Sequence, residues 1–216
     1  ILSRGLGDVY KRQDITSAPP ESMWRNTKSI DDAPDSGEEF SIEFENGDPI
    51  AVNDKKLSPA ELLIKLNDIG SRNGIGRLDI VESRSTGMKS RGCYETPGGS
   101  ILLKARRAIE SICMDGDSIK TKDELISKYS GLIYDGLWWA PERFAIQSLI
   151  DNFSENVQGQ IKILAKKGNV IILSRRSDKS LYKADLASFD EKGDFDQKDA
   201  EGYIKIKSLR LKNRDS

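Results

Sequence analysis

Short alternating stretches around tight turns constrain the fold of this chain most strongly. Residues 39–45 alternate apolar and polar side chains, and Asn46-Gly47 separates them from the apolar stretch 50–52. A second pair of alternating stretches, within residues 157–173, flanks Gly168-Asn169. Asn and Gly tolerate the positive φ angles of two-residue turns, so both regions are predicted β-hairpins. Hairpins pair their strands antiparallel, which argues against a parallel doubly wound sheet.

Helix-start signals predict four helices between these hairpins. Ser58-Pro59-Ala60-Glu61 combines a capping box with proline at the first helical position, and the apolar face behind it runs to Gly70. A second helix is predicted to start at Thr96-Pro97. A third is predicted to start at the capping box from Thr121 to Glu124, and a fourth at Pro141. Because strands and helices do not alternate as βαβ units, we predict an α+β fold, with an antiparallel sheet and its hairpins packed against helices.

The stretch from Gly87 to Gly99 holds the densest set of chemically active side chains. It follows a predicted strand, Arg77 to Ser83, and is predicted to be a loop that enters the second helix. Lys89 and Arg91 beside the free backbone N–H groups of a helix N-terminus would suit a carboxylate or a phosphate. On spacing alone, an ordinary turn with solvated charges is the favoured interpretation.

Glu82 and the Trp138-Trp139 pair are further candidates. Strand alternation turns Glu82 inward just before the Gly87 loop. A carboxylate in this position indicates either a ligand contact or an ion pair with Arg77 or Arg84, and the residues alone favour the ion pair. The adjacent tryptophans are predicted to anchor the core or a contact between subunits.

The composition excludes several classes of protein. The 216 residues include 34 basic and 35 acidic side chains, and a formal charge of -1 gives no overall attraction to nucleic acid or anionic membranes. No apolar run approaches the roughly 20 residues that span a bilayer. The chain has no histidine, the usual general base near neutral pH, and its two cysteines, Cys93 and Cys113, cannot form a disulfide framework. We therefore expect a cytoplasmic protein without a metal site, bound to neither nucleic acid nor membrane.

Longer strings of residues resemble a known family. Gly74-Ile75-Gly76-Arg77-Leu78-Asp79-Ile80-Val81-Glu82, the Gly87–Gly99 string and Asp196–Ile204 occur in the order typical of argininosuccinate synthase. The resemblance starts near Asp14 and reaches the end of the chain. It implies the C-terminal synthetase and multimerisation part of that family, with the corresponding α+β fold.

The resemblance also divides the chain. Residues 1–13 match nothing expected of the family and are interpreted as an assembly artefact, and the missing initiator Met at Ile1 suggests a fragment. Residues 14–38, rich in Pro and Asp, are predicted to form an extended connector. Residues 39–194 would be the synthetase and multimerisation domain, and residues 195–216 a helical tail for oligomerisation.

The family implies an activity and two site residues. Argininosuccinate synthases join citrulline to aspartate in arginine biosynthesis: the ureido oxygen attacks the α-phosphate of ATP, and the aspartate amine then displaces AMP from the citrullyl-adenylate. Glu82 and Tyr94 match the family's citrulline contacts, and no residue matches a catalytic or metal-binding role. The resemblance also implies a homotetramer.

The same resemblance limits what this chain does by itself. No Walker or Ser-Gly-Gly phosphate loop occurs in the sequence, so ATP and Mg²⁺ are expected to bind the absent N-terminal domain. The chain alone is therefore predicted to be inactive. The alternative is a stand-alone, non-catalytic module for oligomerisation or interaction.

Overall fold

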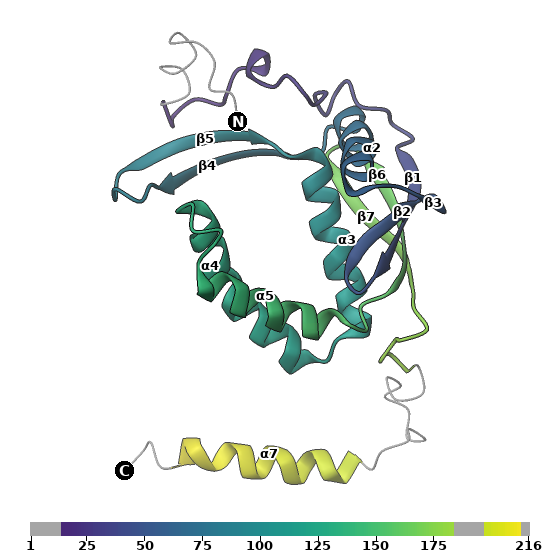
Figure 1. Cartoon of the computed structure of the whole chain (residues 1–216), viewed down its shortest axis with the longest axis vertical. Helices are drawn as coiled ribbons and strands as arrows, with labels where there is room; N and C mark the ends of the chain where they lie inside the picture. The colour runs from purple at the N-terminus through teal and green to yellow at the C-terminus, as the bar shows by residue number, and fades with distance from the viewer. Residues whose placement is uncertain (1–13, 184–196, 213–216) are drawn as a thin grey trace. The chain divides into compact units, whose positions relative to one another are not determined.

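Helices and antiparallel strands together build the protein, as the α+β prediction requires (Figure 1). The computed structural model describes residues 14–183 and 197–212. It separates into two compact units, residues 1–179 and 180–216. Residues 1–13, the predicted artefact, lie outside the described residues.

A five-stranded sheet forms the centre of the first unit. Its strands lie in the order β3 (Lys55–Lys56), β2 (Asp48–Val52), β1 (Glu38–Glu45), β6 (Gly159–Lys166) and β7 (Asn169–Arg176). Every neighbouring pair is antiparallel, which confirms the prediction against a parallel sheet.

Both predicted hairpin turns are present, one of them shifted. Asn46 and Gly47 have φ angles of 49° and 84°, so the β1–β2 turn uses the two residues expected. The β6–β7 turn uses Lys167 and Gly168, with φ angles of 43° and 78°, and Asn169 begins the next strand. Gly168 supplies the left-handed conformation in either register, so the sequence alone did not distinguish the two turns.

Two helices, α2 (Pro59–Arg72) and α3 (Pro97–Cys113), pack on one face of the sheet and close the core (Figure 1). The capping box is present: the Ser58 side chain accepts from the Glu61 N–H and the Glu61 carboxylate accepts from the Ser58 N–H. The predicted end at Gly70 is wrong by two residues. Gly70 instead lies inside α2 where it meets α3, because a Cβ there would sit 2.7 Å from the Pro97 Cβ.

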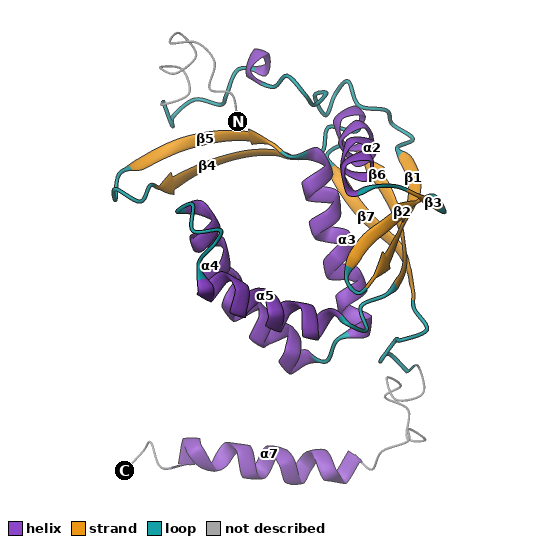
Figure 2. Ribbon diagram, in the orientation of Figure 1, coloured by secondary structure: helices purple, strands orange, loops and turns teal. Residues whose placement is uncertain are grey.

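Helices α4 (Gly116–Tyr134) and α5 (Pro141–Ser154) lie away from the sheet (Figure 2). The predicted start of α5 at Pro141 is confirmed, whereas the predicted start of α4 at Thr121 is wrong. Asp115 caps α4 by accepting from the N–H groups of Asp117 and Ser118, which places Thr121 inside the helix. The side chain at Thr121 is therefore not a cap.

The remaining two strands, β4 (Arg77–Ser83) and β5 (Lys89–Glu95), form a separate hairpin, here called the arm (Figure 2). The predicted strand 77–83 is confirmed residue for residue. The prediction of a loop over Gly87–Gly99 is wrong, because residues 89–95 pair with β4 along their whole length. Glycine and charged residues are weak strand formers, and the pairing with β4 overrides their propensity.

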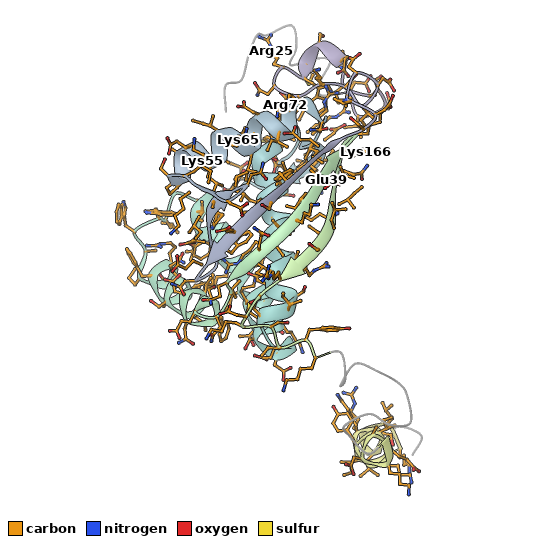
Figure 3. All side chains as sticks on the ribbon, turned by 90° about the vertical axis from the view of Figure 1, so that its right-hand side faces the viewer. Arg25, Glu39, Lys55, Lys65, Arg72 and Lys166 are labelled. Carbon is orange, nitrogen blue, oxygen red and sulfur yellow. The ribbon has the colours of Figure 1, made fainter. Side chains whose placement is uncertain are left out.

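The connector before the sheet combines turns and irregular backbone with one short 3-10 helix, η1 (Glu21–Met23), whose flanking residues Pro20 and Trp24 are extended. In the second unit, α7 (Gln197–Lys212) confirms the predicted tail helix. Figure 3 shows the charged surface around α2: Lys65 and Arg72 on the helix, with Glu39, Lys55 and Lys166 on strands of the sheet. Among the described residues, no helix has the length and apolar character needed to cross a membrane.

Candidate functional site

The register of the arm sorts its side chains onto two faces. Successive residues of a strand point to opposite faces, and directly paired residues share one. Leu78 pairs with Tyr94, Ile80 with Gly92 and Glu82 with Ser90, so one face holds these six residues. The other face, here called the clamped face, holds Arg77, Asp79 and Val81 of β4 with Arg91, Cys93 and Glu95 of β5.

Glu95 binds the connector to the clamped face. Its carboxylate accepts hydrogen bonds from three consecutive backbone N–H groups, those of Arg25, Asn26 and Thr27, at 2.9 to 3.0 Å. The Thr27 hydroxyl donates a further bond at 2.7 Å. Since carboxylate acceptors form stronger hydrogen bonds than neutral ones, this one side chain fixes the path of the connector beside the arm.

Arg77 reinforces the same attachment. Its guanidinium donates to the hydroxyl and the carbonyl of Thr27, each at 2.8 Å, and forms a two-pronged ion pair with Glu21. It also lies over the Trp24 ring, 5.2 Å from the ring centroid. The connector thus lies along one side of the arm, as Figure 1 shows.

Arg91 holds the outer part of the connector. Its guanidinium forms a two-pronged ion pair with Asp79, at 2.5 and 2.7 Å, and donates to the backbone carbonyls of Asp14 and Ser17. Only 6% of the Arg91 side chain is exposed. Hydrogen bonding from Arg91 lowers the pKa of Asp79 below its ordinary value of 3.8, and the pKa of Arg91 is raised in turn. Arg91 is therefore held within the chain rather than available to a ligand.

The opposite face brings Glu82 and Tyr94 together. The Tyr94 hydroxyl donates to Glu82 Oε1, and both side chains are partly buried. The predicted ion pair of Glu82 is wrong: Arg77 binds Glu21, while Arg84 donates to the Ser90 hydroxyl at 3.1 Å. Within the described residues, no Lys or Arg forms an ion pair with Glu82. The Glu82 carboxylate accepts a hydrogen bond from the Tyr94 hydroxyl instead.

The other predicted candidates are not part of this pair. Lys89 is exposed at the first position of β5, and the backbone N–H of Gly98 at the start of α3 already donates to the Asn67 side chain. Trp138 and Trp139 are 47% and 79% exposed, so the prediction that they anchor the core is wrong. Their role as subunit contacts stays a prediction.

The sequence did not predict the contacts by which Glu95 binds the connector. The Glu95 contacts join residues 68 to 70 positions apart, and no local pattern signals such a separation. The one available signal was Glu95 itself, the last strand residue before the Thr96-Pro97 helix start, where a charged side chain can reach back to a neighbouring segment.

Comparisons with known proteins identify the family of the chain. The family model of the arginosuccinate synthase C-terminal domain matches residues 8–214. The chain belongs to this family. The match begins at residue 8, whereas the resemblance in sequence motifs begins near Asp14.

Curated argininosuccinate synthases show what share of a relative's length this chain matches. The chain is 54% identical to that of Campylobacter concisus over 200 residues, 92% of this chain and 49% of that protein. It is 52% identical to that of Alkalilimnicola ehrlichii over 202 residues, 93% of this chain and 50% of that protein. The chain therefore spans about half the length of the curated relatives it matches.

Proposed function

We propose that this chain is the part of an argininosuccinate synthase that holds citrulline, through Glu82 and Tyr94. In the complete enzyme, the citrulline ureido oxygen would attack the α-phosphate of ATP and release pyrophosphate, and the aspartate amine would then displace AMP. The family membership supports the reaction. The geometry of the arm supports the two contacts.

The state of Glu82 is the observation that favours binding of an amino acid. The arm has two other carboxylates, both on the clamped face: Asp79 is bound to the Arg91 guanidinium and Glu95 to backbone N–H groups of the connector. Glu82 has no such cation among the described residues, and its phenol neighbour leaves acceptor sites open on the carboxylate. An amino-acid ammonium supplies the missing positive charge, and a charge-assisted hydrogen bond to it is stronger than one between neutral groups.

The two side chains would position citrulline without transferring protons. The chain has no histidine, and positioning a substrate needs no group that titrates near neutral pH. The sequence also lacks a phosphate-cradling loop, so we propose that ATP and its Mg²⁺ bind residues outside this chain and that the chain alone is inactive.

Steady-state kinetics on a full-length protein containing this chain tests the assignment. Glu82→Gln keeps the size of the side chain and removes its charge, so we expect the KM for citrulline to rise about 10- to 150-fold. Tyr94→Phe loses one neutral hydrogen bond and should raise it about 2- to 10-fold. Both variants should leave the KM for ATP unchanged.

Two controls separate binding from stability. Glu45→Gln makes the same chemical change at an exposed carboxylate at the end of β1, and Tyr129→Phe removes a hydroxyl of α4 that donates to the Gln147 side chain of α5. Neither should change the KM for citrulline. If Glu82→Gln instead lowers the melting temperature and disturbs citrulline and ATP equally, its role is structural and the assignment fails.

We also propose that the tail of this chain mediates self-association, as a homotetramer. Five apolar residues of α7 are each more than half exposed to solvent: Tyr203, Ile204, Ile206, Leu209 and Leu211. Large apolar side chains left exposed on a helix are typical of an interface between subunits. Light scattering with and without residues 195–216 tests this, and an unchanged mass after truncation would remove the tail from the interface.

The same exposed apolar side chains also suit the alternative function, that of a non-catalytic interaction module. Trp138 and Trp139 add exposed aromatic area between α4 and α5. The module would be favoured if a full-length protein containing this chain bound a partner but showed no citrulline-dependent release of pyrophosphate from ATP.

A further inference from the structure

Tyr94 and Glu82 meet across an unusual distance for a side-chain pair in a hairpin. Tyr94 pairs directly with Leu78, and Glu82 lies four positions further along β4. Four residues of a strand span about 13 Å. Side chains in strands stand roughly perpendicular to the sheet, so the phenol must instead lie along the strand to reach the carboxylate.

The residue underneath the Tyr94 ring is Gly92. Gly92 is buried and occupies the same face of the arm, two positions before Tyr94 and opposite Ile80. A Cβ added to Gly92 would lie within 3.0 Å of three atoms of the Tyr94 side chain, including Cζ and the hydroxyl oxygen at 2.6 Å each. The ring therefore occupies the volume that any other amino acid would fill at position 92.

The backbone does not explain a glycine at this position. Gly92 is not among the glycines with positive φ, and it pairs with Ile80 within a continuous ladder. Alanine could adopt this conformation without strain, so the contact with Tyr94 is the obstacle to a side chain. A glycine inside a strand often marks such a close approach by another group.

We propose that Gly92 is a positioning residue for the Glu82–Tyr94 pair. By leaving the surface of β5 open, it lets the phenol lie flat along the strand and place its hydroxyl on Glu82. The effect of Gly92 on substrate binding rests on the proposed function, that Glu82 and Tyr94 hold citrulline. The effect of Gly92 on the position of the Tyr94 ring is independent of that function.

Gly92→Ala isolates this role, because the groups that must move are the far end of a side chain and not backbone. In a full-length protein containing this chain, we expect the KM for citrulline to rise about 2- to 10-fold, as for loss of the Tyr94 hydrogen bond. The KM for ATP and the melting temperature should change little. Gly131→Ala is the matched control, since a Cβ at Gly131 in α4 meets nothing within 4 Å.

A double-mutant cycle separates the contact with the ring from any other effect of the methyl group. Once Tyr94→Ala has removed the ring, Gly92→Ala should have no further effect on the KM for citrulline. Equal effects of Gly92→Ala in the two backgrounds would overturn the proposal, because the methyl group would then act without Tyr94.

Fluorine NMR of fluorotyrosine-labelled protein tests the position of the ring directly. The Tyr94 resonance is assigned as the one lost in Tyr94→Phe, and it should shift in Gly92→Ala but not in Gly131→Ala. An unshifted resonance would refute the positioning role. If Tyr94→Ala itself leaves the KM for citrulline unchanged, the proposed function fails, while the fluorine spectrum still decides whether Gly92 positions the ring.

Discussion

The attachment of α4 to α3 should depend mainly on one buried ion pair, since a second pair between these helices, Arg107 with Asp123, is 40% exposed on both sides. Among the described residues of this 19-residue helix, Lys122 alone is buried, and its ammonium lies 2.6 Å from the Glu110 carboxylate of α3. The two side chains are 8% and 2% exposed. Arg106 approaches the same carboxylate at 2.6 Å, and Arg107 at 3.6 Å.

These contacts predict that replacing Glu110 lowers the free energy of unfolding more than replacing Lys122 does. Glu110→Leu leaves the buried Lys122 ammonium without a counter-charge, which should cost roughly 3–5 kcal/mol of unfolding free energy. Lys122→Met keeps an apolar stem of similar length, and Glu110 retains both arginines, so its cost should be about 1–2 kcal/mol. The double variant should recover most of the loss, because an apolar pair of similar volume often replaces a buried ion pair without cost.

Urea denaturation of the four proteins in this cycle measures the costs, and hydrogen exchange locates them. Amide exchange in α4 should accelerate more in Glu110→Leu than exchange in α2, because α4 has fewer buried residues than α2 and weakly packed helices open locally first. The reasoning is refuted if Lys122→Met destabilises the protein as much as Glu110→Leu, or if α4 and α2 respond alike.

Two further predictions concern the clamped face of the arm. Because the pKa of folded Asp79 lies below 3.8, its ion pair stabilises the protein above that pH and is lost as the pH falls through the lower folded pKa. Asp79→Asn should flatten this part of the acid denaturation curve and lower the stability near neutral pH; an unchanged curve would contradict it. Glu95→Gln should free the connector, so that trypsin cleaves after Arg25 and Lys28 faster than in the unaltered chain, whereas cleavage after the exposed Arg72 in α2 should keep its rate.

Local signals in the sequence identified most of the elements near them. The capping box at Ser58 fixes the start of α2, and the Asn46-Gly47 turn fixes the first hairpin, because both patterns act within a few residues. The capping box at Thr121 was misleading, since Asp115 offered an equally good cap six residues earlier. Sequence alone does not rank two caps on one continuous helix.

The site was only partly predictable, because its geometry depends on pairing between strands. Glu82 and Tyr94 were predicted as citrulline contacts through the family resemblance, whereas their hydrogen bond depends on the pairing of β4 with β5, which puts both on one face. The strand β5 itself was missed, since Lys89, Arg91 and Gly92 have low strand propensity without a partner. Because residues 87–99 were interpreted as a loop, the two faces of the arm could not be predicted, and neither could the position of Gly92 under the Tyr94 ring.

Calorimetric titration of citrulline tests the central claim most directly, using a full-length protein that contains this chain. The account predicts that Glu82→Gln raises the citrulline Kd about 10- to 150-fold, while Glu45→Gln leaves it unchanged and both variants melt at the temperature of the unaltered protein. A citrulline Kd that stays the same in a folded Glu82→Gln protein would contradict the account, because the charge of Glu82 would then have no part in holding the substrate.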